Sequence, residues 1–418
     1  MQRAQYEDPV WRFVEAEEAR QESHLELIAS ENHTSEEVLA ALATRLNDKY
    51  AEGYPGRRYY GGCEHVDEVE SLCRDRAKSV FGSAYANVQA HSGTQANVAA
   101  LMALLDAGDR VLAMSLDHGG HLSHGHPKNF SGIFYDFHSY GVEKDTERLD
   151  LDRVRELALE LRPKLLMAGA SAYSRTIDFE GLASIAREVD AHFMVDMAHI
   201  AGLVAGGAHP SPVPHADVVT MTTHKTLRGP RGGLILSTKD WFKKINSLVF
   251  PGNQGGPFMH VIAAKAVALR QAGEPAFQDY AAAVVANAAR LAEVLVARGL
   301  RIVSGGTDNH LMLVDVSGVG LTGAEAEERL GAVGITCNKN LIPYDQMPPM
   351  KASGVRIGTA AVTSRGLGVP EMERLGSWIA DVLTDASGAD GATATRVQSE
   401  VAELSAAFPI RAQLAGRA

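Results

Sequence analysis

Cysteine is scarce in this chain, with only three in 418 residues: Cys63, Cys73 and Cys337. The count is odd and no C-x-x-C pair occurs, which argues against a framework of disulfides. Few, unpaired cysteines are typical of a reducing compartment. We therefore expect a cytoplasmic protein.

The sequence also lacks features of membrane or secreted proteins. No apolar run reaches the ~18 to 20 residues that spanning a bilayer requires, and residues 1–20 are rich in Glu and Arg, unlike a signal peptide. Long runs of one charge sign are missing, while the net charge is −11. The electrostatic field of this negative net charge repels nucleic-acid phosphates and anionic lipids. We expect no nucleic acid and no membrane as a partner, and an anionic ligand must be held by local donors.

The length and composition predict more than one hydrophobic core. A chain of 418 residues, 45% of them hydrophobic, exceeds one ordinary domain and can fill two or three cores. Near its start, residues 8–29 carry apolar side chains at helical spacing among many acidic ones: Val10, Phe13, Val14, Leu25 and Ile28. This pattern predicts an N-terminal helical arm, residues 1–45, that needs another surface to bury its apolar stripe.

From residue 46 to 277, short apolar runs alternate with helical patterns. The runs cover residues 110–116, 164–170, 191–198, 217–223 and 232–237. Strands that alternate with helices predict a large α/β domain, built on a mostly parallel sheet with helices on both faces.

After Gly273 the pattern changes. A long alanine-rich helix over 276–299 precedes another apolar run and further helical patterns, which predict a smaller C-terminal α/β domain, residues 278–418. Residues 385–395, rich in Ala, Gly, Asp and Thr, are expected to form a surface loop. Residues 385–418 carry no recognisable motif, and we infer that they close the small domain as helices.

Two ionisable residues follow neighbouring predicted strands. Asp196 ends the strand of 191–198, and Lys225 follows the strand of 217–223. Ligands of open α/β sheets bind at the carboxyl ends of strands, so both side chains are expected at one edge. A buried ion pair is the alternative interpretation. Pyridoxal phosphate, however, requires an amine for an imine and a carboxylate against its ring nitrogen, and Lys225 and Asp196 supply these.

The segment AHSGTQAN, residues 90–97, lies before a helical pattern. Ser92, Gly93 and Thr94 can present hydroxyls and backbone N–H groups at a helix N-terminus, where a phosphate is favoured. Alone, the same residues are equally consistent with an ordinary helix cap. In combination with the amine and the carboxylate, they predict a pyridoxal-phosphate site.

These segments resemble the serine hydroxymethyltransferase family. The similarity runs in order from about residue 7 to residue 384 and rests on the segments ELIASEN (26–32), KYAEGYPGRRYYGG (49–62), ANVQAHSGTQAN (86–97), VDMAHIAGLV (195–204), TTHKTLRGPRGG (222–233), VFPGNQGGP (249–257), SGGTDNHL (304–311) and SGVRIGT (353–359). The resemblance implies a large seven-stranded sheet domain of the aspartate aminotransferase type, a small C-terminal domain, and a homodimer whose active sites are completed by the partner subunit. A tetramer stays open.

The resemblance also implies roles around the cofactor. Lys225 matches the imine lysine, Asp196 the partner of the pyridine nitrogen, and His121 the residue stacked on the ring. Further positions match residues near the phenolic oxygen (Ser171, His199), near the lysine (Thr222), at the phosphate (Ser92, Gly93, Thr94, His224) and in the partner's contribution to the phosphate site (Tyr50, Gly256).

For the substrates, Arg356 with Ser30 matches the site for the amino-acid carboxylate, which suits a planar guanidinium. Glu52 matches the group that transfers protons, and Tyr60 a second-subunit residue near the substrate. The tetrahydrofolate pocket matches Tyr59, Leu116, Gly120, Leu122 and Asn340. The implied reaction is the reversible transfer of the serine hydroxymethyl group to tetrahydrofolate, giving glycine and 5,10-methylenetetrahydrofolate.

Other interpretations stay open. Tyr54, Tyr59 and Tyr60 could be interface packing, and Arg356 a structural ion-pair partner. A threonine aldolase, a threonine transaldolase or an α-methylserine hydroxymethyltransferase would share Lys225 and Asp196, whereas Glu52, Tyr59 and Asn340 favour the folate-dependent enzyme. The cluster His118, His121, His124 and His126 raises the alternative of a zinc hydrolase, although we assign no metal. A silent RNA-binding scaffold is disfavoured by the acidic charge.

Overall fold

Seven strands form the largest sheet of the computed structural model, which describes residues 8–388 and 391–410. The strands are β4 (Tyr85–Asn87), β5 (Arg110–Met114), β6 (Asp136–Tyr140), β7 (Leu165–Ala168), β8 (His192–Asp196), β9 (Val218–Thr222) and β10 (Gly233–Ser237). Their order is β4-β10-β9-β8-β7-β5-β6. The run from β9 to β6 is parallel, whereas β10 is antiparallel to both its neighbours. The prediction of a mostly parallel seven-stranded sheet is confirmed.

Alternation of side chains along the strands creates a core on each face of this sheet. Leu112, Leu166 and Val195 belong to one buried cluster, and the preceding residues Val111, Leu165 and Met194 belong to another. Successive strand residues point to opposite faces, so two apolar neighbours in sequence require two covered faces. The surrounding helices are α3 (Glu64–Phe81), α4 (Gly93–Leu104), α5 (Phe130–Phe134), α6 (Leu151–Leu161), α7 (Phe179–Glu188), α8 (Ala201–Ala205), α9 (Lys239–Ser247) and α10 (Met259–Ala272).

Two strands of the sheet were not among the predicted runs. β6 has the sequence DFHSY and pairs only with β5, so it is an edge strand with little apolar character. β4 is three residues long and also lies at an edge. Neither strand is enclosed by neighbours on both sides, and neither therefore needs the continuous apolar run that reveals a central strand.

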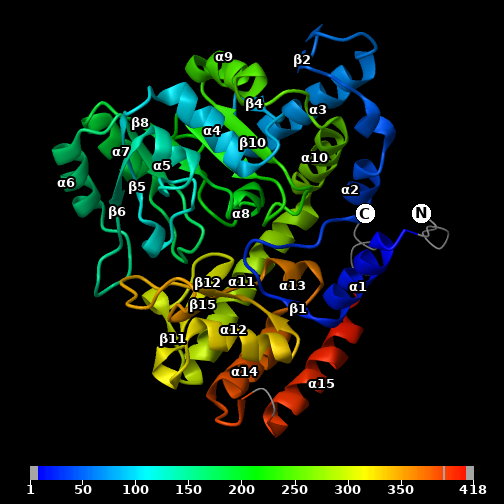
Figure 1. Cartoon of the computed structure of the whole chain (residues 1–418), viewed down its shortest axis with the longest axis vertical. Coiled ribbons are helices and arrows are strands. Elements are labelled where there is room, and N and C mark those ends of the chain that lie inside the picture. The colour runs from blue at the N-terminus through cyan, green and yellow to red at the C-terminus, as the bar shows by residue number, and fades with distance from the viewer. Residues whose placement is uncertain (1–7, 389–390, 411–418) are drawn as a thin grey trace.

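A second body has its own sheet and core. Its strands β11 (Arg301–Ile302), β12 (Leu311–Asp315), β14 (Asn338–Asn340) and β15 (Gly354–Gly358) are antiparallel in the order β11-β12-β15-β14. The helices α12 (Gly323–Ala332), α13 (Ala360–Ser364), α14 (Val369–Thr384) and α15 (Ala392–Ala407) accompany them. Figure 1 shows this body, in yellow to red, beside the large sheet body.

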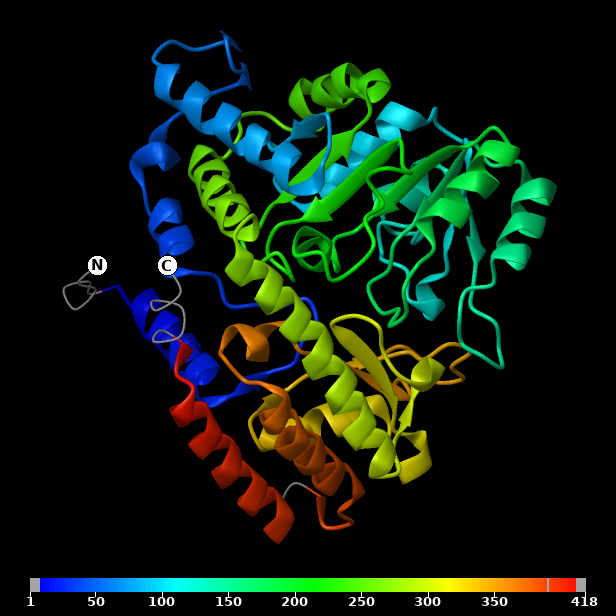
Figure 2. The ribbon, with the colours of Figure 1, turned by 180° about the vertical axis from the view of Figure 1, so that it is seen from behind.

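One long helix, α11 (Pro275–Ala297), joins the two bodies. Phe277 and Tyr280, near its start, belong to the core beneath the large sheet, while Leu291 and Leu295 belong to the core of the second body. Figure 2 shows it running from one body into the other. The expected domain boundary at 277/278 falls within its first turn, and the division into 1–45, 46–277 and 278–418 stays a prediction. By length and composition α11 is apolar enough to cross a membrane, but a core helix has the same properties.

The N-terminal arm is only partly the helix that the sequence predicted. α1 (Val10–Ser23) ends before His24, and β1 (Leu25–Glu26) then pairs in parallel with β13 (Ile335–Thr336). Leu25 is fully buried in the second core as part of a strand, because β13 offers it backbone partners and an apolar face. α1 itself has no buried residue, and Phe13 is 63% exposed. α1 packs on α15, but its apolar residues Val10 and Phe13 stay exposed in the described part of this chain.

The remaining segments connect these bodies. They are α2 (Glu36–Leu42), which packs on α10, the hairpin of β2 (Gly53–Tyr54) and β3 (Arg57–Arg58), and the short turns η1 (Arg45–Asp48), η2 (Leu116–His118), η3 (Leu248–Asn253), η4 (Val303–Gly305) and η5 (Ser317–Val319). Of the surface loop predicted for 385–395, positions 389–390 lie outside the described residues, and Ala392 already begins α15. α15 packs its apolar face into the second core, whereas residues 411–418 lie outside the described residues.

Candidate active site

The parallel strands β8 and β9 bring Asp196 and Lys225 to one edge of the large sheet. Asp196 is the last residue of β8, and Lys225 comes three residues after the end of β9, in the turn that leads to β10. Their charges interact, and both side chains are buried, at 8% exposure each. The edge of the sheet thus combines an acid and an amine as the sequence predicted.

Asp196 is held by several donors that keep it ionised. Its Oδ2 accepts hydrogen bonds from Asn97 Nδ2 at 2.8 Å and from His124 Nε2 at 3.2 Å, and its Oδ1 accepts one from the backbone N–H of Ala198. Burial alone would raise the pKa of this carboxyl, but the hydrogen bonds from His124 and Asn97 lower it well below its usual range. Asp196 is therefore a carboxylate with a fixed orientation.

Burial has the opposite effect on the neighbouring amine. It lowers the pKa of Lys225 from 10.5 to about 8; the charge of Asp196 opposes this shift, and the charges of Arg356 and Arg231 add to it. The turn is fixed by Asn32, whose Nδ2 donates to the Lys225 carbonyl at 2.9 Å. With a pKa of about 8, roughly a tenth of the Lys225 amine is neutral and nucleophilic at pH 7, far more than at the ordinary lysine pKa of 10.5.

The segment 92–94 lies at the N-terminus of α4. Ser92 caps this helix by accepting a hydrogen bond from the backbone of Gln95, which leaves the N–H groups of the first turn aimed outward. Gly93 is packed so closely on Thr222 that a Cβ would lie 2.6 Å from the Thr222 methyl. The helix N-terminus therefore adjoins the end of β9. His224, between Thr222 and Lys225, has a buried Nδ1 without a partner among the described residues.

Three more predicted residues surround the pair. Burial lowers the pKa of His121 to about 4 and that of His199 well below its ordinary value, so both rings are neutral. His199 Nδ1 lies 3.2 Å from Nε2 of His310 and shares a hydrogen bond with it. Ser171 donates its backbone N–H to Gly119 at 2.7 Å, which ties the end of β7 to the loop before His121.

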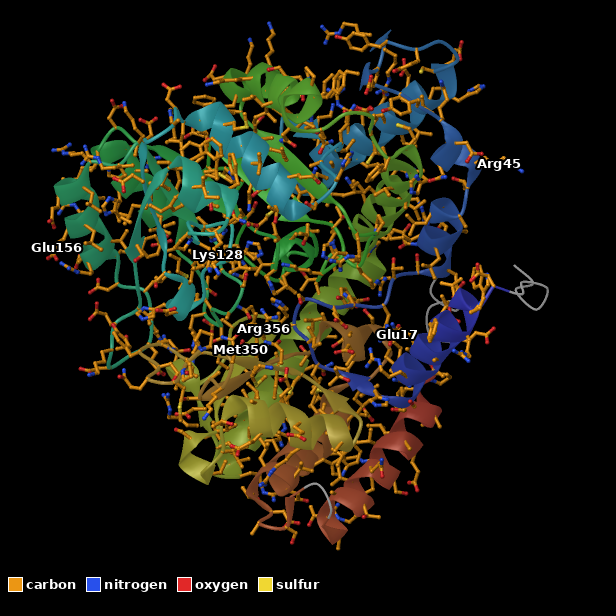
Figure 3. The ribbon with its side chains drawn as sticks, viewed as in Figure 1. Glu17, Arg45, Lys128, Glu156, Met350 and Arg356 are labelled. Carbon is orange, nitrogen blue, oxygen red and sulfur yellow. The ribbon has the colours of Figure 1, made fainter. Side chains whose placement is uncertain are left out.

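Arg356 comes from β15 of the second body and reaches across to the large body. Its Nη1 donates to the Ser171 carbonyl at 2.7 Å, and its Nε donates to Asn338 Oδ1 at 3.2 Å. Burial lowers its pKa to about 10. Figure 3 shows it where the two bodies meet. Ser30 follows Ala29, which packs on the end of β15 at Gly358, and Asn340 lies on β14 beside β15.

The loop 116–122 carries the other predicted folate positions. Leu116 begins η2, and Gly120 is close-packed, since a Cβ there would lie 2.3 Å from the Met114 carbonyl. Leu122 is 58% exposed. Because the Ser171 and Ala172 amides both donate to Gly119, this loop borders the edge that holds Arg356.

The remaining predicted residues form a separate cluster on the β2–β3 hairpin. Tyr60 donates its hydroxyl to Glu52 Oε2 at 3.3 Å, its ring lies 5.2 Å from that of Tyr50, and Tyr50 packs on Gly256. Tyr59, Tyr50 and Tyr60 are 75%, 56% and 48% exposed. In the described part of the chain, no hydrogen bond or ring contact joins this cluster to Lys225, Asp196 or Arg356. The predicted site is therefore divided into two groups within one chain.

The hairpin is rigid despite its exposed tyrosines. Arg58 is buried and donates to Asp67 and Glu70 at 2.7 Å each, and to the carbonyls of Ala51 and Gly53. Glu70 is fully buried and also accepts from Gln89, next to β4. This network fixes Glu52 and its neighbours to the large body.

Comparisons with known proteins decide what kind of site this is. Residues 4–379 match the family model described as serine hydroxymethyltransferase. The chain is 57% identical over 405 residues to a serine hydroxymethyltransferase of Koribacter versatilis, covering 97% of this chain and 95% of that protein. It is 56% identical over 407 residues to serine hydroxymethyltransferase 1 of Pseudomonas aeruginosa, covering 97% of both. The chain belongs to the serine hydroxymethyltransferase family.

Membership of this family confirms the predicted enzyme class. The chain is a pyridoxal-phosphate-dependent transferase of serine and glycine one-carbon metabolism, and the family uses tetrahydrofolate. The aldolases and the α-methylserine enzyme are not favoured, since the family model and both relatives carry the serine hydroxymethyltransferase name.

The histidine cluster is arranged differently from the metal alternative. His121, His124 and Asp196 have ligand atoms within 4.8 Å of one another. His118 instead accepts a hydrogen bond from the backbone of Val142, and His126 accepts one from that of Lys128. The four histidines of the sequence motif therefore do not converge on one point. In a serine hydroxymethyltransferase, His124 has a clear use as a donor to Asp196.

Three residues that hydrogen-bond to the predicted site residues escaped the sequence reasoning. Asn97 and His124 fix Asp196, and His310 fixes His199. Asn97 lies within the quoted segment AHSGTQAN, and its position on α4, one turn beyond Gly93, was a signal that its side chain faces the sheet. His310 comes from the other body, and nothing in the sequence links it to position 199.

Proposed function

We propose that this serine hydroxymethyltransferase binds pyridoxal phosphate covalently through the Nζ of Lys225, with the ring nitrogen against Asp196. The observation that carries the proposal is the buried pair of groups at adjoining strand ends, an amine with a pKa lowered to about 8 and a carboxylate pinned in its ionised form. An ionised Asp196 favours a protonated pyridine nitrogen, the form that accepts electrons best.

The residues present fit the rest of the cofactor. The first turn of α4, capped by Ser92, supplies outward N–H groups for a phosphate, and Gly93 leaves no side chain in the way. The buried Nδ1 of His224 is available as a further partner. His121 supplies a neutral ring for stacking, and Ser171, His199 and Thr222 border the same edge. We assign Thr94 to the phosphate with Ser92.

Arg356 is proposed to bind the carboxylate of serine or glycine, with Ser30 beside it. Two of its nitrogens are held by Asn338 and Ser171, so the planar fork is oriented before the substrate arrives. The reaction is the reversible transfer of the serine hydroxymethyl group to tetrahydrofolate, which gives glycine and 5,10-methylenetetrahydrofolate.

The chain's own groups then position the substrate and move protons. When bound, pyridoxal phosphate withdraws electrons from the amino acid's Cα as the hydroxymethyl carbon leaves. Glu52 is proposed to move the proton of the serine hydroxyl, with Tyr60 donating to its carboxylate. Leu116, Gly120, Leu122, Tyr59 and Asn340 are proposed to line the tetrahydrofolate pocket.

A homodimer is proposed because the two groups of residues do not meet within one chain. The hairpin cluster with Tyr50, Glu52 and Tyr60, together with Gly256, would complete the site of the partner subunit. Exposed tyrosines on the hairpin and the exposed Val10 and Phe13 of α1 offer surface for such an interface. Three free, buried cysteines are consistent with the cytoplasm, which we propose as its location.

Borohydride reduction of the cofactor-loaded protein, followed by peptide mapping, tests the covalent assignment. The label is expected on the peptide that contains Lys225 and is expected to be lost in Lys225→Arg. A label on another lysine contradicts the assignment. Conversion of serine to glycine, measured with and without tetrahydrofolate, tests the reaction: turnover that does not depend on tetrahydrofolate contradicts the proposed transfer.

A further inference from the structure

A second lysine, Lys265 of α10, is buried directly behind the proposed phosphate site. Its side chain is 1% exposed, and its Nζ donates to three backbone carbonyls: Val88 at 2.7 Å, Ala90 at 3.0 Å and Gly233 at 2.7 Å. An ammonium has three N–H donors, so these acceptors satisfy it completely. The geometry is that of a charged, protonated lysine.

The ammonium of Lys265 is in direct contact with no carboxylate of the described residues. Within residues 8–388 and 391–410, no carboxylate forms an ion pair with Nζ. Glu70 is close enough to raise the pKa of Lys265, but its oxygens already accept from Arg58 and Gln89. Burial lowers the pKa of Lys265 to about 8, so the ammonium predominates at pH 7. An uncompensated buried charge is costly, and a function that uses it accounts for its presence.

The three carbonyls belong to the backbone that leads into the phosphate segment. Ala90 precedes Ser92 by two residues, and its carbonyl also accepts the N–H of Gly233 at 3.0 Å. The packing is too close for side chains: a Cβ on Gly233 would lie 2.3 Å from the Ser92 carbonyl, and one on Gly232 would lie 2.5 Å from Lys265 Cε. The position of the α4 N-terminus relative to the sheet therefore depends on Lys265.

We propose that Lys265 is a positioning residue for the cofactor's phosphate: it fixes the backbone entering α4 and places a buried positive charge behind the anion. This inference rests on the proposed function. The helix N-terminus supplies the direct N–H donors, and Lys265 adds a charge that low-dielectric surroundings leave poorly screened. The phosphate dianion, in turn, supplies a negative charge that is not already paired within the protein, as that of Glu70 is with Arg58.

Comparison of two ligands separates this role from simple stabilisation. Pyridoxal carries the same ring and aldehyde as pyridoxal phosphate but no phosphate. In Lys265→Met, the dissociation constant of the apoenzyme for pyridoxal phosphate is expected to rise about 10-fold or more, and that for pyridoxal by less than about 2-fold. Inorganic phosphate, titrated as a competitor of pyridoxal phosphate, is expected to bind more weakly by a similar factor.

Arg365 provides a matched control. It is also a buried cation whose hydrogen bonds all go to backbone carbonyls, those of Gln21, Glu22, His24, Ser405 and Phe408, far from α4 in the fold, although the Glu22 carboxylate lies 3.9 Å from one of its nitrogens. Arg365→Met is expected to lower stability without changing the ratio of the two dissociation constants. If Lys265→Met does not fold, Lys265→Gln, which keeps two N–H donors but no charge, is expected to show the same selective loss.

The outcomes distinguish the inference from the function on which it rests. The role of Lys265 is overturned if its variants lose affinity for pyridoxal phosphate and pyridoxal equally, or if Arg365→Met changes the ratio of the two dissociation constants. Either result leaves the proposed cofactor site intact. If the parent apoenzyme binds pyridoxal phosphate no better than pyridoxal, the phosphate site itself is wrong.

Discussion

A lysine amine in water is a poor nucleophile at neutral pH, because nearly all of it is protonated. Burial lowers the pKa of Lys225 to about 8. The negative charge of Asp196 opposes this shift, whereas the positive charges of Arg356 and Arg231 add to it. The neutral fraction of this amine is therefore controlled by groups that belong to the same site.

This control predicts a pH dependence of cofactor attachment. Only the neutral amine attacks an aldehyde, so the rate of covalent binding to the apoenzyme is expected to rise with pH up to about 8 and then level off. Stopped-flow absorbance after mixing with pyridoxal phosphate measures it. Arg231→Gln removes a positive charge that lowers the pKa of Lys225, so the inflection is expected to move to higher pH. Asp196→Asn removes a negative charge that raises this pKa, so the inflection is expected to move to lower pH. An inflection near 10.5 in the parent enzyme would refute the shift.

Glu52 carries the second prediction at this scale. Glu52→Gln keeps the shape of the side chain but cannot accept a proton, so folate-dependent turnover is expected to fall ~10²- to 10⁴-fold. Binding of pyridoxal phosphate and glycine, measured by absorbance, is expected to stay at the parental level. Asp48→Asn, an exposed acid in the same segment, serves as the control and is expected to leave turnover unchanged. Parental turnover in Glu52→Gln removes this residue from the proton-transfer role.

The sequence could predict Asp196 and Lys225 because Asp196 ends one apolar strand and Lys225 comes three residues after another, and parallel strands bring their ends together. It could not predict Lys265 or His310. Lys265 acts through backbone carbonyls of a distant segment, and such acceptors have no sequence signature. His310 meets His199 only because two separate bodies pack together.

At the scale of the helix and the strand, prediction depended on burial. The fully buried strands β7 and β9 were visible as apolar runs, and the edge strand β6 was not. The end of α1 was also misplaced, since Leu25 and Ile28 continue its helical spacing although β1 is extended. Pairing with β13 overrode the local pattern there, and the sequence of α1 contains no hint of that partner.

Helix caps allow structural and functional effects to be separated. Ser92 caps α4, and Thr322 caps α12, where the Thr322 backbone N–H in return donates to the Glu325 carboxylate. Alanine at either position is expected to lower the free energy of unfolding by about 1 kcal/mol, measured with urea. Only Ser92→Ala is expected to weaken pyridoxal-phosphate binding as well, because α4 alone faces the proposed phosphate site. Equal binding by both variants would reduce Ser92 to an ordinary cap.

At the scale of the whole molecule, the site is divided between the sheet edge and the hairpin. From the sequence alone, the tyrosines of the hairpin could be either active-site residues or interface packing. A sequence segment does not indicate whether its side chains contribute to the site of its own chain or to that of a partner. The separation of Glu52 from Lys225 within the described chain favours a shared site.

Complementation between inactive chains tests this arrangement. A purified heterodimer of Lys225→Ala with Glu52→Gln contains one fully native site of two if sites are shared, and is expected to show about half of the parental activity. A heterodimer of Lys225→Ala with Asp196→Asn is the control, because each of its sites keeps one defect from the sheet edge, and no activity is expected. Failure of the first pair to recover activity would place all catalytic groups in one chain.

The continuous helix α11 has a consequence for how substrate enters. Its two ends are packed in different cores, so a large rotation of one body against the other would have to break backbone hydrogen bonds in the middle of α11. The span between Arg356 on one side and Lys225 on the other is therefore set when the chain folds. Because all α-amino acids have the same separation between amine and carboxylate, whatever their side chain, a fixed span accepts them alike and disfavours β- and γ-amino acids, in which the two groups lie farther apart.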